Sequence, residues 1–157
     1  MALKIPFSQY DWPLANPEWT PFNHQINTTK FLITNKRAYV LNELGTGKTL
    51  SAIWAANFLM RNRVINKVLV VSPLSTIGSV WYDSIRQNLG TKSVGIAHGS
   101  KQKRINVLNH EFEYTIINHD GVKILEQELI KQRYDVIIID ELTAFKTYNT
   151  DRSKSMR

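Results

Sequence analysis

Residues 38–49 read Ala-Tyr-Val-Leu-Asn-Glu-Leu-Gly-Thr-Gly-Lys-Thr, and this stretch decides the fold. An apolar run, 38–41, leads into a glycine-rich turn, and an apolar helical pattern then continues to Met60. The order strand, glycine loop and helix is the context in which backbone N–H groups cradle a phosphate. The positive end of the helix dipole favours the same anion. The stretch predicts a nucleotide-phosphate site; the alternative is a turn that contains Gly-Lys-Thr by chance.

Two side chains of this loop have specific expected roles. Lys48 can reach the outer phosphates of a nucleotide, and the Thr49 hydroxyl can bind Mg²⁺. The strict form of the motif begins with glycine, whereas this chain has Asn42 at that place. The residues expected to line the phosphates are Leu44, Gly45, Thr46, Gly47, Lys48 and Thr49.

The rest of the chain continues the alternation of strands and helices. Apolar runs predict strands at 67–72, 93–97, 114–118 and 135–139, after the first strand at 38–41. Helical periodicity is expected at 23–34, 50–60, 77–89, 101–108 and 122–130, with Ser75, Ser100 and Asp120 as candidate N-caps of the last three. Continuously apolar strands that alternate with helices imply an α/β fold, a parallel β-sheet flanked by helices on both faces.

A parallel sheet of this kind places its ligands at the carboxyl ends of the strands. The loops expected at that edge are 42–49, 72–76, 98–100, 118–121 and 140–143. Asp140 and Glu141 follow the most apolar run, 136–139. Downstream of a phosphate loop, the first carboxylate of such a pair can hold Mg²⁺ and the second can activate water. The alternative is an acidic loop without a catalytic role after a core strand. This alternative is less favoured because a phosphate loop is also present.

Composition sets the class of protein. The chain has 157 residues, no cysteine and a formal net charge of +7. It is long enough for a single domain with a real core, and it has no run long enough to span a membrane. The charge favours a polyanionic partner such as nucleic acid, with a generally basic soluble protein as the alternative. The absence of cysteine and of a signal peptide fits a cytoplasmic protein.

Residues 1–21 contain closely spaced prolines and aromatic residues. Prolines at this density exclude a helix, so the segment is expected to be an ordered arm whose aromatic side chains pack on the domain. A less favoured role for these aromatic side chains is to line the base side of a nucleotide pocket.

Several motifs, taken in order, resemble one family over 21–157. These are Pro21-Phe22-Asn23-His24-Gln25, the phosphate loop, Val70-Val71-Ser72-Pro73-Leu74-Ser75, His98-Gly99-Ser100 with Arg104, Ile116-Ile117-Asn118-His119-Asp120, and Asp140-Glu141-Leu142-Thr143 with the stretch after it. The chain resembles the first RecA-like motor lobe of superfamily-two helicases, and among these the Swi/Snf-like DNA translocases. The last motif is similar to their DExx box.

The resemblance implies ATP and Mg²⁺ as cofactors and DNA as the partner, and its turn at His98-Gly99 favours duplex DNA over RNA. It implies that Gln25 binds the adenine edge, that Lys48, Asp140 and Glu141 are catalytic, and that Thr49 and Asp140 hold the metal. One DNA strand would run along Ser72, Pro73, Leu74, Asn118 and His119, through sequence-independent backbone contacts. The compact lobe suits a phage or bacterial protein.

The chain departs from the family in three ways. Asn42 replaces a small or acidic residue, Leu142-Thr143 lacks the histidine often found after the acidic pair, and residues 1–157 do not include the second lobe, which we expect in a longer protein or in a partner chain. That lobe, in the same chain or another, would supply arginines worth about 10³ to 10⁵ in rate. We therefore expect 1–157, a single ATP-binding domain, to bind ATP weakly and hydrolyse it slowly. The alternatives are an RNA helicase lobe and a non-catalytic module that binds nucleic acid or protein.

Overall fold

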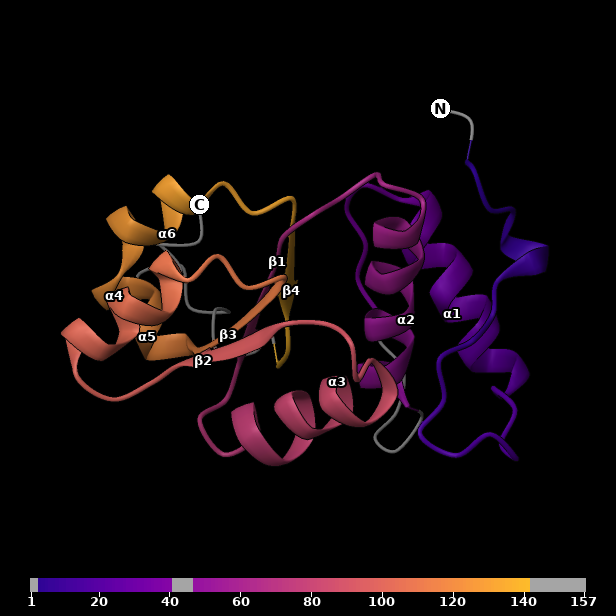
Figure 1. Ribbon diagram of the computed structural model, residues 1–157, viewed down its shortest axis with the longest axis horizontal. Helices are drawn as coiled ribbons and strands as arrows, with labels where there is room; N and C mark the ends of the chain where they lie inside the picture. Colours follow the sequence, from indigo (N-terminus) through magenta and orange to yellow (C-terminus); the bar gives the residue numbers. More distant parts are fainter. Residues whose placement is uncertain (1–2, 41–46, 142–157) are drawn as a thin grey trace.

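A computed structural model of the chain describes residues 3–40 and 47–141 (Figure 1). Its centre is a sheet of four parallel strands in the order β2-β3-β1-β4. The strands are β1 (Val68–Ser72), β2 (Val94–Ala97), β3 (Tyr114–Asn118) and β4 (Val136–Ile139). The predicted α/β fold with a parallel sheet is confirmed.

Two helices precede β1, and the other helices lie in the intervals between the four strands. They are α1 (Asn23–Thr34), α2 (Lys48–Arg61), α3 (Asp83–Asn88), α4 (Lys101–Asn109), α5 (His119–Ile124) and α6 (Glu126–Gln132), with a 3₁₀ turn η1 (Phe7–Gln9) and a π-helical turn η2 (Ile77–Tyr82). No helix in 3–40 or 47–141 is long and apolar enough to cross a membrane.

Alternation along the strands divides the core into two faces, because successive side chains of a strand point to opposite sides. On one face, Val68 and Val70 of β1 pack with side chains of α2, η2 and α3. On the other face, Leu69 and Val71 pack with side chains of α4, α5 and α6. The helices therefore cover both faces of the sheet, as the apolar strands predict.

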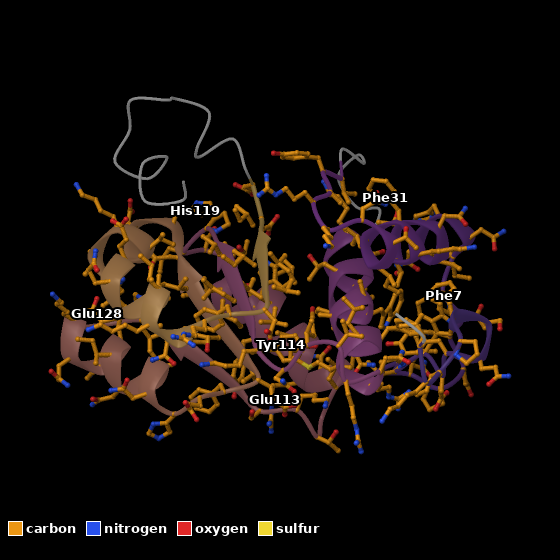
Figure 2. All side chains as sticks on the ribbon, turned by 90° about the horizontal axis from the view of Figure 1, so that it is seen from above. Phe7, Phe31, Glu113, Tyr114, His119 and Glu128 are labelled. Atoms are coloured by element: carbon orange, nitrogen blue, oxygen red, sulfur yellow. The ribbon has the colours of Figure 1, made fainter. Side chains whose placement is uncertain are left out.

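The N-terminal arm packs on the side of α2 that faces away from the sheet, where Figure 2 labels Phe7. Tyr10 is buried there against Phe58, and its hydroxyl donates to the Trp54 carbonyl at 3.2 Å. The Trp54 indole N–H in turn donates to the Pro13 carbonyl at 2.9 Å. The expected burial of the arm's aromatics holds for Tyr10, whereas Trp19 is exposed.

One predicted strand is absent from the part of the chain that the structure describes. Residues 38–40 carry no strand, and Leu41 lies outside the described residues. The sheet of the described residues therefore ends at β4, whose Ile137 is 51% exposed, and Tyr39 is 73% exposed. An apolar run predicts burial, but a strand also needs a hydrogen-bonding neighbour, which only the tertiary structure supplies.

The three expected N-caps have different outcomes. Ser100 accepts from the Lys103 N–H at 3.3 Å, so its cap on α4 is confirmed. Ser75 is not a cap: η2 begins after Thr76, whose hydroxyl bonds to Ser72 and the Pro73 carbonyl instead. Asp120 is not a cap either, because helix α5 already begins at His119 and places Asp120 in its first turn. At that position the negative charge of Asp120 still interacts favourably with the positive end of the helix dipole.

We expect Tyr114→Phe to stabilise the fold by about 1 kcal/mol. Tyr114 lies in the interior of the molecule, where Figure 2 labels it, and within the described residues its buried hydroxyl has no hydrogen-bond partner. Burial raises the pKa of Tyr114 for the same reason, since the charged form would be desolvated. Removing a desolvated, unpaired hydroxyl should raise the free energy of unfolding measured in urea.

Tyr10→Phe is the matched control and should destabilise by about 1–2 kcal/mol. Its hydroxyl is bonded, since it accepts from the Asn57 amide at 2.7 Å. Burial raises the pKa of Tyr10 to about 12, above the usual 10 of an unfolded chain. The contribution of Tyr10 to the free energy of unfolding is thus complete below pH 10, and it is lost as the pH rises from 10 toward 12. Equal effects of the two substitutions at neutral pH would contradict this assignment.

Candidate nucleotide site

The end of the glycine loop packs closely on α1. Gly47 stands immediately before α2 with φ 71° and ψ 30°, a left-handed conformation that glycine adopts without a steric penalty. A Cβ at this position would collide with the Gln25 amide nitrogen and would lie 3.2 Å from its carbonyl carbon. Both the backbone angle and the neighbour therefore require glycine here.

Gln25 is buried between the starts of two helices. Its Oε1 accepts from the Phe22 backbone N–H at 2.9 Å, which satisfies a donor at the start of α1. Its Nε2 faces Gly47 at the start of α2. Next to it, the exposed rings of Phe22 and His24 stack at 5.6 Å between centroids and 10° between planes. The adenine contact of Gln25 stays a prediction, and the structure adds that this side chain packs on the phosphate loop.

Lys48 and Thr49 occupy the first turn of α2, a helix of 14 residues. Figure 1 shows that α2 begins at the edge of the molecule where β1 and β4 end. A helix of this length directs its first N–H groups and its positive dipole end toward that edge. Leu44, Gly45 and Thr46, the other expected phosphate ligands, lie outside the described residues.

Asp140 is held at three of its polar atoms. Its backbone N–H donates to the Val71 carbonyl at 2.8 Å, which extends the β1–β4 pairing by one residue. Its Oδ2 accepts from the Trp81 indole N–H at 3.0 Å. Its carbonyl oxygen lies 2.9 Å from the His119 Nε2, which must carry the proton because a carbonyl can only accept. The position of Asp140 is thus fixed by η2, β1 and α5.

Glu141 follows with a different geometry. Its φ of 55° is in the left-handed region, and its side chain is exposed. A residue other than glycine there carries a strain of roughly 1–3 kcal/mol, which the surrounding structure must offset. The Asp140 carboxylate bonds to Trp81, whereas the backbone turns at the exposed Glu141.

The residues expected to contact DNA differ in exposure. Pro73 and Leu74 are accessible, with Leu74 55% exposed. Ser72, Asn118 and His119 are buried in the described structure. Ser72 bonds to the Thr76 hydroxyl at 2.6 Å. The structure brings the ends of β1 and β3 together but turns these three side chains inward.

Arg104 joins the loops after β2 and β3. Its Nε donates to the Gly99 carbonyl at 2.9 Å, and its Nη1 lies 3.4 Å from the Asn118 Oδ1. Gly99 has φ 98°, so the turn needs glycine, and a Cβ on Gly121 would contact the Arg104 guanidinium. The arginine thereby fixes Asn118, the residue before His119.

Sequence reasoning missed the contact of Trp81 with the site. The helical pattern assigns Trp81 to a buried apolar face, and it is indeed 2% exposed within the core. Only its indole N–H marks a second role, since a buried tryptophan usually finds an acceptor for that group. The acceptor lies 59 residues away in sequence, so no local pattern could identify it.

The donor set fits Mg²⁺. Thr49 and Asp140 offer hydroxyl and carboxylate oxygens, the hard ligands that this ion prefers. Within the described residues there is no cluster of three or more His, Cys, Asp or Glu side chains that could hold a metal ion. Mg²⁺ does not need one, because it is usually bound by one or two protein oxygens together with waters and substrate phosphates.

Comparison with solved structures identifies the fold. The chain is similar to the structure entitled "Sulfolobus solfataricus SWI2/SNF2 ATPase core in complex with dsDNA", with a TM-score of 0.74 and 18% identity. The similarity covers 91% of this chain and 30% of that one. Together with the family match and the helicase relatives given below, this similarity supports the first RecA-like lobe of a superfamily-two helicase.

The family follows from the sequence match. Residues 18–147 match the family described as "Type III restriction enzyme, res subunit", and the chain belongs to this family. It is 26% identical to the uncharacterized ATP-dependent helicase YqhH of Bacillus subtilis, over 99% of this chain and 28% of that protein. It is 28% identical to the ATP-dependent helicase fft1 of Schizosaccharomyces pombe, over 73% of this chain and 13% of that protein. The chain spans less than a third of the relatives it matches.

Proposed function

We propose that this chain is the ATP-binding lobe of a Swi/Snf-like DNA translocase, which couples hydrolysis to movement on DNA when a second lobe completes it. The observation that carries the proposal is the shared edge: Gly47 leads into α2, which begins with Lys48 and Thr49, at the edge where β4 ends and Asp140 and Glu141 follow it. A phosphate cradle and an acidic pair at one edge of a parallel sheet are suited to phosphoryl transfer.

The residues of this site would divide the reaction between them. The Lys48 ammonium would neutralise the outer phosphates, and the first N–H groups of α2 would bind their oxygens. Thr49 and Asp140 would hold Mg²⁺, which screens the charge of the phosphates when it is bound. The Glu141 carboxylate, accessible at the surface, would accept a proton from the attacking water. Gln25 would select adenine while it keeps Gly47 in place.

DNA is the proposed partner, as in the solved structure to which the fold is similar. The half-buried Pro73 and the exposed Leu74 follow β1 at the site edge, and the exposed Lys101 and Lys103 lie in the first turn of α4, just after β2. A net charge of +7 supports contact with a phosphate backbone. We place the protein in the cytoplasm of a bacterium or of a phage-infected cell, which the bacterial relative supports.

Lys48→Ala tests the proposal. The parent chain should bind ATP in the presence of Mg²⁺, and the variant should bind it roughly 10- to 100-fold more weakly, because a charge-assisted hydrogen bond to phosphate is lost. Isothermal titration of both proteins, with Lys36→Ala as the control for surface charge, measures this difference. Lys36 is exposed and lies beyond α1.

Equal affinities of parent and Lys48→Ala for ATP would instead favour a non-catalytic binding module with the same fold.

A separate titration with duplex DNA and with duplex RNA of one sequence identifies the preferred nucleic acid. Preference for RNA would favour the RNA helicase lobe.

A further inference from the structure

Asp140 has two neighbours that hold it from elements far apart in sequence. Trp81, from η2, donates its indole N–H to the Asp140 carboxylate, and His119, from α5, donates its Nε2–H to the Asp140 carbonyl. Trp81 is 2% exposed and His119 is 6% exposed. Asp140 is itself half-buried, so both bonds are partly shielded from water, which makes them stronger and their geometry more constrained than at a fully exposed site.

The local structure around Trp81 is unusual and serves this contact. Its backbone N–H bonds to the Thr76 carbonyl at 3.1 Å, five residues back, so the turn is π-helical. Turns of this width are rare and occur most often at functional sites. Val136 and Ile138 of β4 pack on the same face of the sheet as Trp81, and alternation places Asp140 on that face as well.

The contacts of His119 are equally organised. Asn118, the residue before it, is fixed by Arg104, and a Cβ on Gly121 would lie 2.7 Å from Ile117 and 2.9 Å from the Asn118 Oδ1. The start of α5 is therefore tightly packed. His119 is buried and bonds to the Asp140 carbonyl, so it holds the backbone that carries the acidic pair.

From these contacts we infer that Trp81 and His119 are positioning residues for the metal-binding carboxylate of Asp140. Trp81 fixes Oδ2, and His119 fixes the backbone at the point where the chain turns toward Glu141. Neither residue touches nucleotide or metal in this assignment. The inference rests on the proposed function, because it concerns the residue that would hold Mg²⁺.

The test is the Mg²⁺ dependence of nucleotide binding. In Trp81→Phe, which keeps a buried ring but loses the N–H donor, the Mg²⁺ concentration for half-maximal ATP binding should rise on the order of fivefold. ATP binding in excess chelator should stay as in the parent, because the phosphate loop is untouched. If Trp81 mattered only for folding, Trp81→Phe would change ATP binding with Mg²⁺ and ATP binding in chelator to the same degree.

Trp54→Phe is the matched control. Trp54 is also buried and also donates its indole N–H, but to the Pro13 carbonyl in the arm. Both substitutions therefore remove one part-buried hydrogen bond, and only Trp81→Phe should change the Mg²⁺ dependence. For His119, alanine should raise the Mg²⁺ requirement and glutamine, which keeps a donor near the Nε2 position, should restore it in part.

The outcomes are distinguishable. If the parent and Lys48→Ala bind ATP equally, the proposed function itself fails. If the parent binds ATP with Mg²⁺ and Trp81→Phe matches Trp54→Phe in its Mg²⁺ dependence, the positioning role of Trp81 is wrong while the proposed function stands. If His119→Ala weakens DNA binding without changing the Mg²⁺ requirement, His119 contacts DNA and the inference fails for that residue.

Discussion

Gly47→Ala should lower the free energy of unfolding by about 2–4 kcal/mol and abolish measurable ATP binding. The φ of 71° costs a residue with a Cβ roughly 1–2 kcal/mol, and the new methyl group must also displace the Gln25 amide. Displacement breaks the bond from Gln25 to the Phe22 N–H at 2.9 Å, so the starts of α1 and α2 shift together. Urea denaturation and isothermal titration with ATP measure the two effects.

Two further variants separate the causes. Gly78→Ala is the control for alanine at a glycine, because a Cβ there would meet nothing within 4 Å and the backbone is not left-handed. Its stability should stay within about 0.5 kcal/mol of the parent. Gln25→Ala combined with Gly47→Ala removes the collision but keeps the backbone strain, so the penalty at position 47 should become smaller. A Gly47→Ala protein as stable as Gly78→Ala would contradict the geometry of the loop.

Glu141→Gln should slow ATP hydrolysis by roughly 10² to 10⁴ while ATP still binds, because the amide cannot accept the proton of the attacking water. Single-turnover hydrolysis with protein in excess measures this, which suits a lobe with slow turnover. Glu141→Gly should lose hydrolysis to the same degree and yet stabilise the fold by about 1 kcal/mol, since its φ of 55° suits glycine. Strain at a functional residue is expected to trade stability for activity.

Glu111→Gly is the matched control for that gain. Glu111 is exposed, has φ 53° and follows α4, in the connection to β3. Glycine should stabilise there to a similar degree and leave hydrolysis unchanged. If Glu141→Gln retains the parent's rate, Glu141 is not the base, and the acidic pair would need another assignment.

The local elements were predictable from the sequence because they depend on periodicity and on the residues at their ends. The pattern at 23–34 coincides with α1, and the apolar run 114–118 coincides with β3. The N-cap at Ser100 is correct for the same reason, since the cap and its helix are adjacent in sequence. The position of Asp140 and Glu141 after a strand also follows from the apolar run alone.

Contacts between distant segments could not be predicted in this way. The expected strand at 38–41 shows the limit, since 38–40 are apolar but form no strand in the described residues. The burial of Asn118 and His119 is a second case, because a polar residue in a strand-end loop looks accessible until its neighbours are known. The π-helical turn around Trp81 has the apolar pattern of an ordinary helix, so the sequence did not indicate it.

The sequence by itself determined the alternating α/β order, the phosphate loop with Lys48 and Thr49, and the acidic pair at a strand end. These are local features, set by side-chain period, glycine and the order of residues along the chain. Only the tertiary structure decided that Gln25 packs on Gly47 and that Trp81 and His119 hold Asp140. The reason is physical: such bonds join atoms from segments 21 to 59 residues apart, and the packing of helices on the sheet brings them within 3 Å.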